Sequence, residues 1–129
     1  MVGLELADFL SERGRFVTVL EEGGCFATQM AIPRRWRVLY VLRERGVSLL
    51  TDVKVKEIMG DAVEFITNGD ELKTVEADTV ILATGTVPDQ DLFDKVKALC
   101  PEVHLLGDCN KIGYIKGSLA DAVNVATAI

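Results

Sequence analysis

The chain has 129 residues, of which 49% are hydrophobic, and its 14 basic and 20 acidic side chains give a formal net charge of −6. This length fits one domain that buries about two-thirds of its unfolded surface. The negative charge argues against general binding to nucleic acids or anionic membranes, and no apolar run approaches the roughly 18 residues that span a bilayer. The three cysteines lack a Cys-x-x-Cys spacing, which argues against a metal site or disulfide framework and favours reduced thiols in a cytoplasmic protein.

The first 21 residues predict a helix and then a strand. Small and apolar side chains recur at helical spacing over residues 3–13. Gly14 follows, where the left-handed residue that ends many helices belongs. The apolar run over residues 16–20 predicts a strand, which ends at an acidic residue, Glu21.

A second helix and strand are predicted next. Pro33 begins a helix that runs to Arg45, and Gly46 ends it. Residues 47–50 form a short strand. Five arginines make this helix locally basic: Arg34, Arg35, Arg37, Arg43 and Arg45. They could guide an anionic cofactor or an acyl-CoA, although such a run is more often a solvated face.

The apolar period then changes from helical to alternating, which is typical of strands with one buried face. The predicted strands are 53–58, 62–67 and 72–77, and turn residues at 60–61 and 68–70 separate them. We therefore predict a three-stranded antiparallel meander over residues 53–78.

Two further apolar runs predict buried parallel strands, because strands covered on both faces need not alternate. The run 79–83 stops at Thr84 and Gly85, whose small side chains would let a backbone or a flat ligand approach closely. The run 103–106 stops at Gly107 and Asp108.

Helices are predicted after each of these runs. Asp89 can cap a helix that reaches about Leu99. Ser118 can cap a last helix over residues 119–129.

The order of these elements predicts an α/β fold: a Rossmann-like parallel sheet that lacks its first strand and carries an inserted three-stranded antiparallel β-meander. We expect one partial domain over residues 1–129, with an α/β core formed by 1–52 and 79–129 and the meander at 53–78.

Together these motifs resemble the C-terminal FAD/NAD(P)-binding region of the NADH:flavin oxidoreductase / 2,4-dienoyl-CoA reductase / trimethylamine dehydrogenase group. These flavoproteins have two dinucleotide-binding domains, and an inserted β-meander is characteristic of them. The resemblance covers nearly the whole chain. It implies binding of NAD and FAD and hydride transfer between them.

The chain is expected to begin inside a dinucleotide-binding motif. That motif runs strand, Gly-x-Gly-x-x-Gly, helix, strand and acid. Gly3 suits the third glycine and Glu21, 18 residues later, suits the acid. The first two glycines, which shape the pyrophosphate cradle, are absent from this sequence, so we expect a fragment in which cofactor binding is weak or absent. Loss of the first strand would also expose strand edges, so we expect a homo-oligomer or a strand-swapped dimer.

The resemblance also implies roles for individual residues. Glu21 would bond the adenosine ribose of NAD and disfavour NADPH; the alternative is a solvated acid at a strand end. Ala83, Thr84 and Gly85 would line the nicotinamide-nucleotide site; the alternative is a plain transition from strand to loop. Gly107 and Asp108 would face FAD, with the aspartate bonding its ribityl chain.

No catalytic residue and no metal site is predicted. Cys109 could be a reactive thiol near a helix N-terminus, but an inert packing role is the more ordinary interpretation. His104 is expected to be structural. The chain is thus interpreted as part of an NADH-dependent flavin oxidoreductase that is inactive alone. The alternative is a non-catalytic α/β subunit for assembly or nucleotide sensing, completed by a partner chain.

Overall fold

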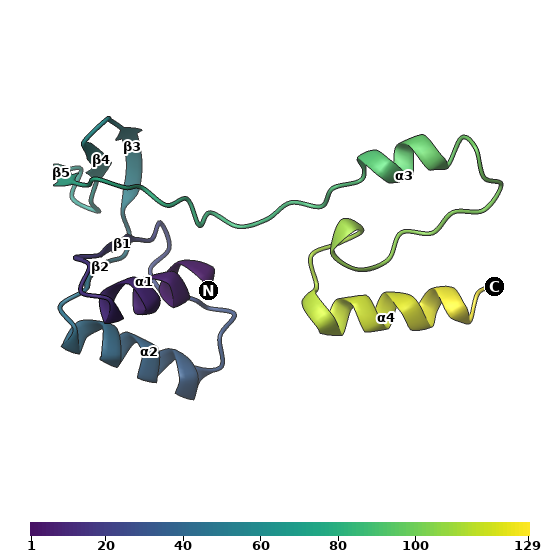
Figure 1. Cartoon of the computed structure of the whole chain (residues 1–129), viewed down its shortest axis with the longest axis horizontal. Helices are drawn as coiled ribbons and strands as arrows, with labels where there is room; N and C mark the ends of the chain where they lie inside the picture. The colour runs from purple at the N-terminus through teal and green to yellow at the C-terminus, as the bar shows by residue number, and fades with distance from the viewer. The chain divides into compact units, whose positions relative to one another are not determined.

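The computed structural model describes residues 1–129, which form two compact units, residues 1–83 and 84–129. The first unit contains two helices, a parallel pair of strands and an antiparallel sheet, and the second contains two helices and a short 3₁₀ turn (Figure 1).

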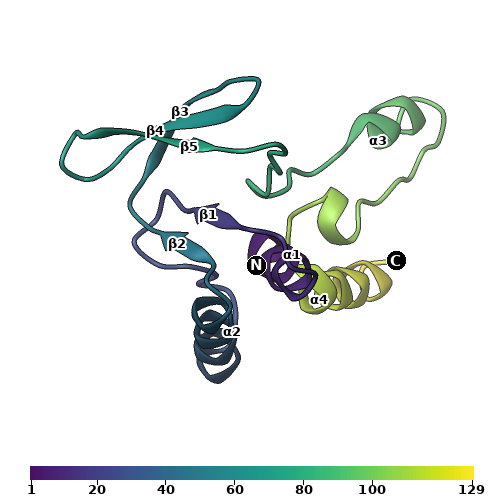
Figure 2. The same cartoon turned by 60° about the vertical axis from the view of Figure 1, so that its left-hand side comes forward.

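The α/β part of the first unit confirms the order predicted for residues 1–50. Its elements are α1 (Val2–Glu12), β1 (Thr18–Leu20), α2 (Ile32–Glu44) and β2 (Ser48–Leu50). The strands pair in parallel, with Thr18 opposite Ser48, and α1 packs against both α2 and β1 (Figure 2). The core between these elements includes Leu4 and Ala7 of α1 and the fully buried Leu42 of α2.

Both helices of this part end at a glycine, as predicted. Gly14 has φ +73° and Gly46 has φ +75°, in the left-handed region that glycine enters at no steric cost. After α1, the N–H groups of Gly14 and Arg15 donate to the carbonyls of Ser11 (3.0 Å) and Leu10 (3.1 Å). This is the Schellman arrangement, which satisfies carbonyls that the helix leaves unpaired.

The predicted meander is confirmed. The strands β3 (Lys54–Ile58), β4 (Ala62–Ile66) and β5 (Leu72–Glu76) form an antiparallel sheet with β4 in the centre. Ala62, Val63 and Phe65 of the central strand are buried. A register shift between Val55 and Glu57 marks a bulge in β3.

In the second unit the predicted helices are present but their limits differ. Here α3 (Asp91–Val96) is shorter than the predicted helix 89–99, although the Asp89 carboxylate does accept the N–H of its first residue, Asp91 (3.1 Å). The turn η1 (Gly107–Cys109) precedes α4 (Tyr114–Ala126).

The predicted cap of the last helix was wrong. The helix α4 begins at Tyr114, so Ser118 lies inside it. The Ser118 hydroxyl donates to the carbonyl of Tyr114 (2.9 Å), which is the usual bond of a serine inside a helix.

Two predicted strands, 79–83 and 103–106, are also wrong in this structure. Neither segment forms a backbone ladder, and Val80, Ile81 and Leu82 are all exposed. A strand exists only where a neighbouring backbone pairs with it, and no part of the chain pairs with these two segments. The α/β class and the parallel-plus-meander organisation are nevertheless confirmed, with a parallel sheet made by β1 and β2.

Candidate functional site

The start of α1 brings together two of the predicted site residues. A Cβ atom added to Gly3 would lie 3.3 Å from the Cβ of Ala83, closer than ordinary van der Waals contact. Glycine therefore allows the first turn of α1 to approach the segment that ends at Ala83. These two residues are 80 positions apart in the sequence, and the structure places them side by side.

The same helix end presents backbone donors. The carbonyl of Met1 accepts the N–H groups of Leu4 (3.1 Å) and Glu5 (3.3 Å). The first N–H groups of an α-helix have no partner within the helix. They lie at the positive end of the helix dipole. This arrangement can accept an anionic group such as phosphate.

Glu21 lies at the carboxyl end of the parallel strands. Its N–H donates to the carbonyl of Leu50 (2.9 Å), and its own carbonyl accepts the N–H of Val53 (3.2 Å). The half-buried side chain folds back, so that Oε1 accepts the N–H of Gly23 (3.1 Å). The other carboxylate oxygen forms no hydrogen bond, so it is available to accept from a hydroxyl group.

The predicted residues Thr84 and Gly85 begin the second unit and are exposed. Gly85 has φ +109°, a conformation that side chains rarely adopt, but no atom lies within 4 Å of the position of an added Cβ. The backbone conformation, and not a close neighbour, is therefore what requires glycine there.

Gly107 and Asp108 are the first two residues of the turn η1, which precedes α4. Gly107 is buried, and a Cβ added to it would lie 2.8 Å from the Ser118 hydroxyl oxygen. The Asp108 carboxylate atom Oδ1 accepts the N–H groups of Gly113 and Tyr114, both at 2.9 Å. Asp108 is thus the residue that caps α4, while its other oxygen, Oδ2, forms no hydrogen bond.

The sequence gives no local signal for this role, because Asp108 lies five residues before Gly113, the first residue whose N–H it accepts. Asp121 was not predicted either: its Oδ2 accepts the N–H of Gly107 (3.1 Å) and the side-chain amide of Asn110 (3.3 Å). An aspartate within a helical pattern looks like an ordinary solvated residue, so no local signal identified it.

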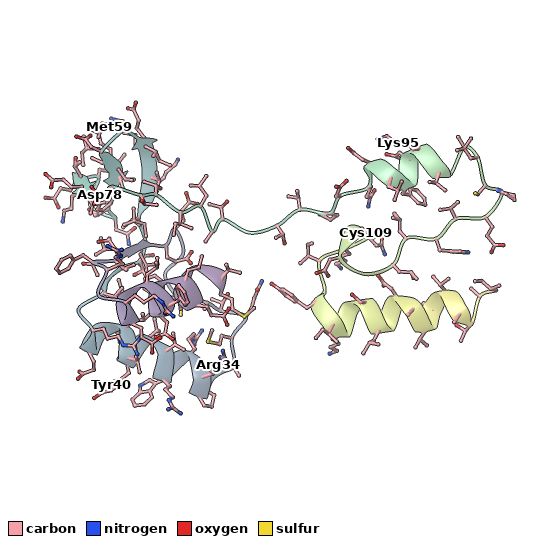
Figure 3. The ribbon with its side chains drawn as sticks, in the orientation of Figure 1. Arg34, Tyr40, Met59, Asp78, Lys95 and Cys109 are labelled. Carbon is pink, nitrogen blue, oxygen red and sulfur yellow. The ribbon has the colours of Figure 1, made fainter.

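The remaining candidates of the second unit lie around an open cavity of about 530 Å³ between α3 and residues 103–109. Its lining includes Phe93, His104 and Cys109. His104 Nε2 lies 3.0 Å from the Glu102 carboxylate. The thiol of Cys109, which Figure 3 shows at the turn before α4, donates to the carbonyl of Leu106 (3.0 Å).

Neither a metal cluster nor a membrane-spanning helix is found. The structure has no group of three or more His, Cys, Asp or Glu side chains placed to hold a metal ion. None of its helices is long and apolar enough to cross a membrane.

Comparison with known families gives the identity of the fold. The family model for pyridine nucleotide-disulphide oxidoreductases matches residues 1–115. The chain belongs to this family. Pyridine nucleotide-disulphide oxidoreductases bind FAD and NAD(P), so the resemblance inferred from the sequence is confirmed at the level of the family.

Curated relatives of this family are reductases much longer than this chain. The bilirubin reductase of Mediterraneibacter gnavus is 34% identical over 114 residues, which are 86% of this chain and 17% of that protein. The cinnamate reductase of Clostridium sporogenes is 25% identical over 138 aligned positions, which cover 100% of this chain and 20% of that protein. The chain therefore spans about a fifth of the length of these relatives.

Solved structures support the same assignment. The structure of 2-naphthoyl-CoA reductase in complex with 2-naphthoyl-CoA superposes with a TM-score of 0.85 and 29% sequence identity. The match covers 98% of this chain and 19% of the reductase chain. Histamine dehydrogenase from Rhizobium sp. 4-9 matches 96% of this chain and 21% of its own, with a TM-score of 0.83 and 16% identity, which is a likeness of fold alone.

Proposed function

We propose that this chain is the nucleotide-binding part of an NADH-dependent flavin oxidoreductase, in which it binds NAD(H) and contributes to FAD binding for hydride transfer. The contact between Gly3 and Ala83 is the observation that carries the proposal. In a dinucleotide-binding fold, a glycine at this point lets the helix pack closely on the adjoining segment and aim its N-terminus at the pyrophosphate.

The first unit offers NAD(H) hydrogen-bond donors at the start of α1 and a hydrogen-bond acceptor at Glu21. The unpaired N–H groups at the start of α1 would hold the pyrophosphate. The free carboxylate oxygen of Glu21 would accept from the adenosine ribose hydroxyls, because this residue follows β1 as the acid of a dinucleotide-binding motif does. A 2′-phosphate at that place would meet a negative charge, so NADH is favoured over NADPH.

The second unit fits FAD through Gly107 and Asp108. The Asp108 oxygen that does not cap α4 would accept from a ribityl hydroxyl, and the capped helix end lies beside it. Ala83, Thr84 and Gly85 would line the nicotinamide-nucleotide site. Bound FAD supplies the chemistry of hydride acceptance, while the residues of this chain bind and orient the cofactors.

The substrate of the whole enzyme is not assigned. The relatives are named for different substrates, bilirubin and cinnamate among them, and substrate choice depends on sites grafted onto a fold. We expect these 129 residues to be inactive alone, and to bind NADH only weakly until the complete site is assembled.

A second function is favoured by the exposed run Val80-Ile81-Leu82, whose backbone is unpaired. Such an edge is a template for another strand. The chain would then be a non-catalytic subunit for assembly or nucleotide sensing, completed by a partner chain or by a strand-swapped second copy.

Nucleotide preference tests the first proposal. NADH and NADPH are titrated to millimolar concentration into the chain and into its Glu21→Gln and Glu22→Gln variants, with binding followed by calorimetry. We expect NADH to bind more tightly than NADPH, and Glu21→Gln to lose about tenfold in NADH affinity, since a charge-assisted hydrogen bond is worth about 1.5–3 kcal/mol. Glu22 is exposed and forms no ion pair, so its variant should bind as the wild type does. A preference for NADPH, or equal losses in the two variants, would contradict the proposal.

A further inference from the structure

One face of α2 carries an exposed stripe of large apolar and aromatic side chains. Ile32, Trp36 and Tyr40 are 71%, 69% and 51% exposed. They recur every four residues and so follow one line along the helix. The rings of Trp36 and Tyr40 are stacked, with centroids 5.7 Å apart and planes inclined by 17°. Tyr40 projects from α2 away from α1 (Figure 3).

The stripe is bordered by cations that have no partner. Of the five arginines near α2, Arg34 and Arg45 pair with carboxylates of α1, at 3.4 Å from Glu5 and 2.6 Å from Asp8. Arg37 and Arg43 form no ion pair, and each lies three residues from Tyr40, next to the aromatic rings on the helix surface. Glu44, four residues after Tyr40, adds one exposed carboxylate to the same line. With Arg37 and Arg43 the face still has one net positive charge, although the whole chain has a net charge of −6.

We propose that this face of α2 docks an acidic amphipathic helix of a partner protein. The residue types on the face, Trp, Tyr and Arg, are those that carry most of the binding energy at protein interfaces. Because the two rings already stack on each other, less side-chain freedom is lost when a partner covers them. Carboxylates on the partner would meet Arg37 and Arg43, whose planar guanidinium groups favour paired hydrogen bonds.

Other occupants match the face less well. A second copy of the same face would bring four arginines against only two glutamates, Glu44 of each copy, so the two faces repel. Single-stranded nucleic acid also stacks on aromatic rings beside arginines, but it needs a positive groove that follows its backbone, and a chain of net charge −6 repels polyphosphate. The proposal goes beyond the proposed function, since it uses none of the residues to which that function assigns NAD or FAD. It also differs from the alternative in which these arginines guide an anionic cofactor.

Trp36 is the single tryptophan of the chain, so its own fluorescence reports on this face. The probe is a synthetic peptide of about three heptads, long enough to form a helix. Leu residues form one apolar face of this helix, and Glu residues border that face. We expect a saturable blue shift of Trp36 emission, and an affinity that falls at least tenfold between about 50 mM and about 500 mM salt. The same peptide with Lys in place of Glu should give no shift.

The decisive comparison uses two charge-matched double variants that both retain Trp36. Arg37→Glu with Arg43→Glu should lower the peptide affinity at least tenfold. Arg15→Glu with Lys54→Glu changes the net charge equally at exposed residues away from the stripe and should lower it less than threefold. Circular dichroism of both variants checks that the helices remain.

Four results would overturn the proposal. They are the absence of any shift with the acidic peptide, equal losses in the two double variants, a stronger response to a single-stranded oligonucleotide, and a concentration-dependent shift without peptide that coincides with a dimer in sedimentation. The third would assign the face to nucleic acid and the fourth to a second copy. NADH binding, measured in parallel, should be the same in all these variants, so failure here is distinct from failure of the proposed function.

Discussion

At the scale of single residues, two aspartates hold the turn η1 against the start of α4. Asp108 accepts two N–H groups from the start of the helix, and Asp121, about two helical turns into α4, accepts the N–H of Gly107. The two carboxylates therefore brace the turn from both sides. The same turn holds the residues proposed to face FAD, so its geometry bears directly on the site.

Replacing Asp108 should weaken the start of α4. Asp108→Ala leaves the N–H groups of Gly113 and Tyr114 without their acceptor, and loss of a helix cap costs about 1 kcal/mol. We expect faster amide hydrogen exchange in the first turn of α4, by about fivefold. Asp94→Ala, a change at an exposed residue of α3, should leave that turn unaffected, and equal exchange in both variants would show that Asp108 does not cap the helix.

Gly107 should tolerate no side chain. It has φ +73°, and an added Cβ would lie 2.8 Å from the Ser118 hydroxyl oxygen. Gly107→Ala is therefore expected to destabilise the second unit by about 1–3 kcal/mol through backbone strain and overlap, measured by urea unfolding. Gly60→Ala is the control, since nothing lies within 4 Å of its added Cβ. A Gly107→Ala protein as stable as the control would contradict the close packing.

At the scale of elements, short-range signals predicted the helices and the meander, but could not predict every strand. Gly14 and Gly46 end α1 and α2 because the bonds that they make lie within five residues of the chain. The meander strands are joined by short turns, so their partners are also close in sequence. The runs 79–83 and 103–106 have equally strong strand patterns, yet a parallel strand depends on a distant partner, which no local pattern supplies.

Within the candidate site too, features with a local or family signal were predicted, and features that depend on distant contacts were not. A family motif predicted that Gly3 packs the start of α1 closely, but it did not identify Ala83 as the residue that Gly3 meets. The roles of Asp108 as a cap and of Asp121 as its companion were not, because both depend on how η1 folds against α4.

The helix ends give a test at this scale. Gly46→Ala forces a side chain into the left-handed conformation after α2 and should cost about 1–2 kcal/mol, whereas Gly46→Asn should cost less, because asparagine enters that conformation more readily. Thermal unfolding followed by circular dichroism measures the difference. An alanine variant as stable as the asparagine variant would show that the left-handed conformation at Gly46, after α2, contributes little to the need for glycine there.

At the scale of the whole molecule, the chain belongs to an oxidoreductase family and spans about a fifth of the length of the bilirubin and cinnamate reductases. Its exposed run Val80-Ile81-Leu82 has an unpaired backbone, which the second proposed function assigns to pairing with another strand. If a second copy supplies that strand, sedimentation at micromolar concentration should show a dimer. Leu82→Lys should shift the equilibrium from dimer towards monomer, because a charge on a pairing edge opposes association. A monodisperse monomer in the unmodified protein would argue against this pairing.

The central claim is that the start of α1 and the end of β1 form one half of a nucleotide site. The most direct test is to map the backbone amide chemical shifts of the chain during titration with NADH. The account predicts the largest chemical-shift changes at Gly3 and Leu4 and at Glu21 to Gly24. The variant Gly3→Asn should lose these changes. Changes confined to α2 or to the meander, or a Gly3 variant that responds as the wild type does, would contradict it.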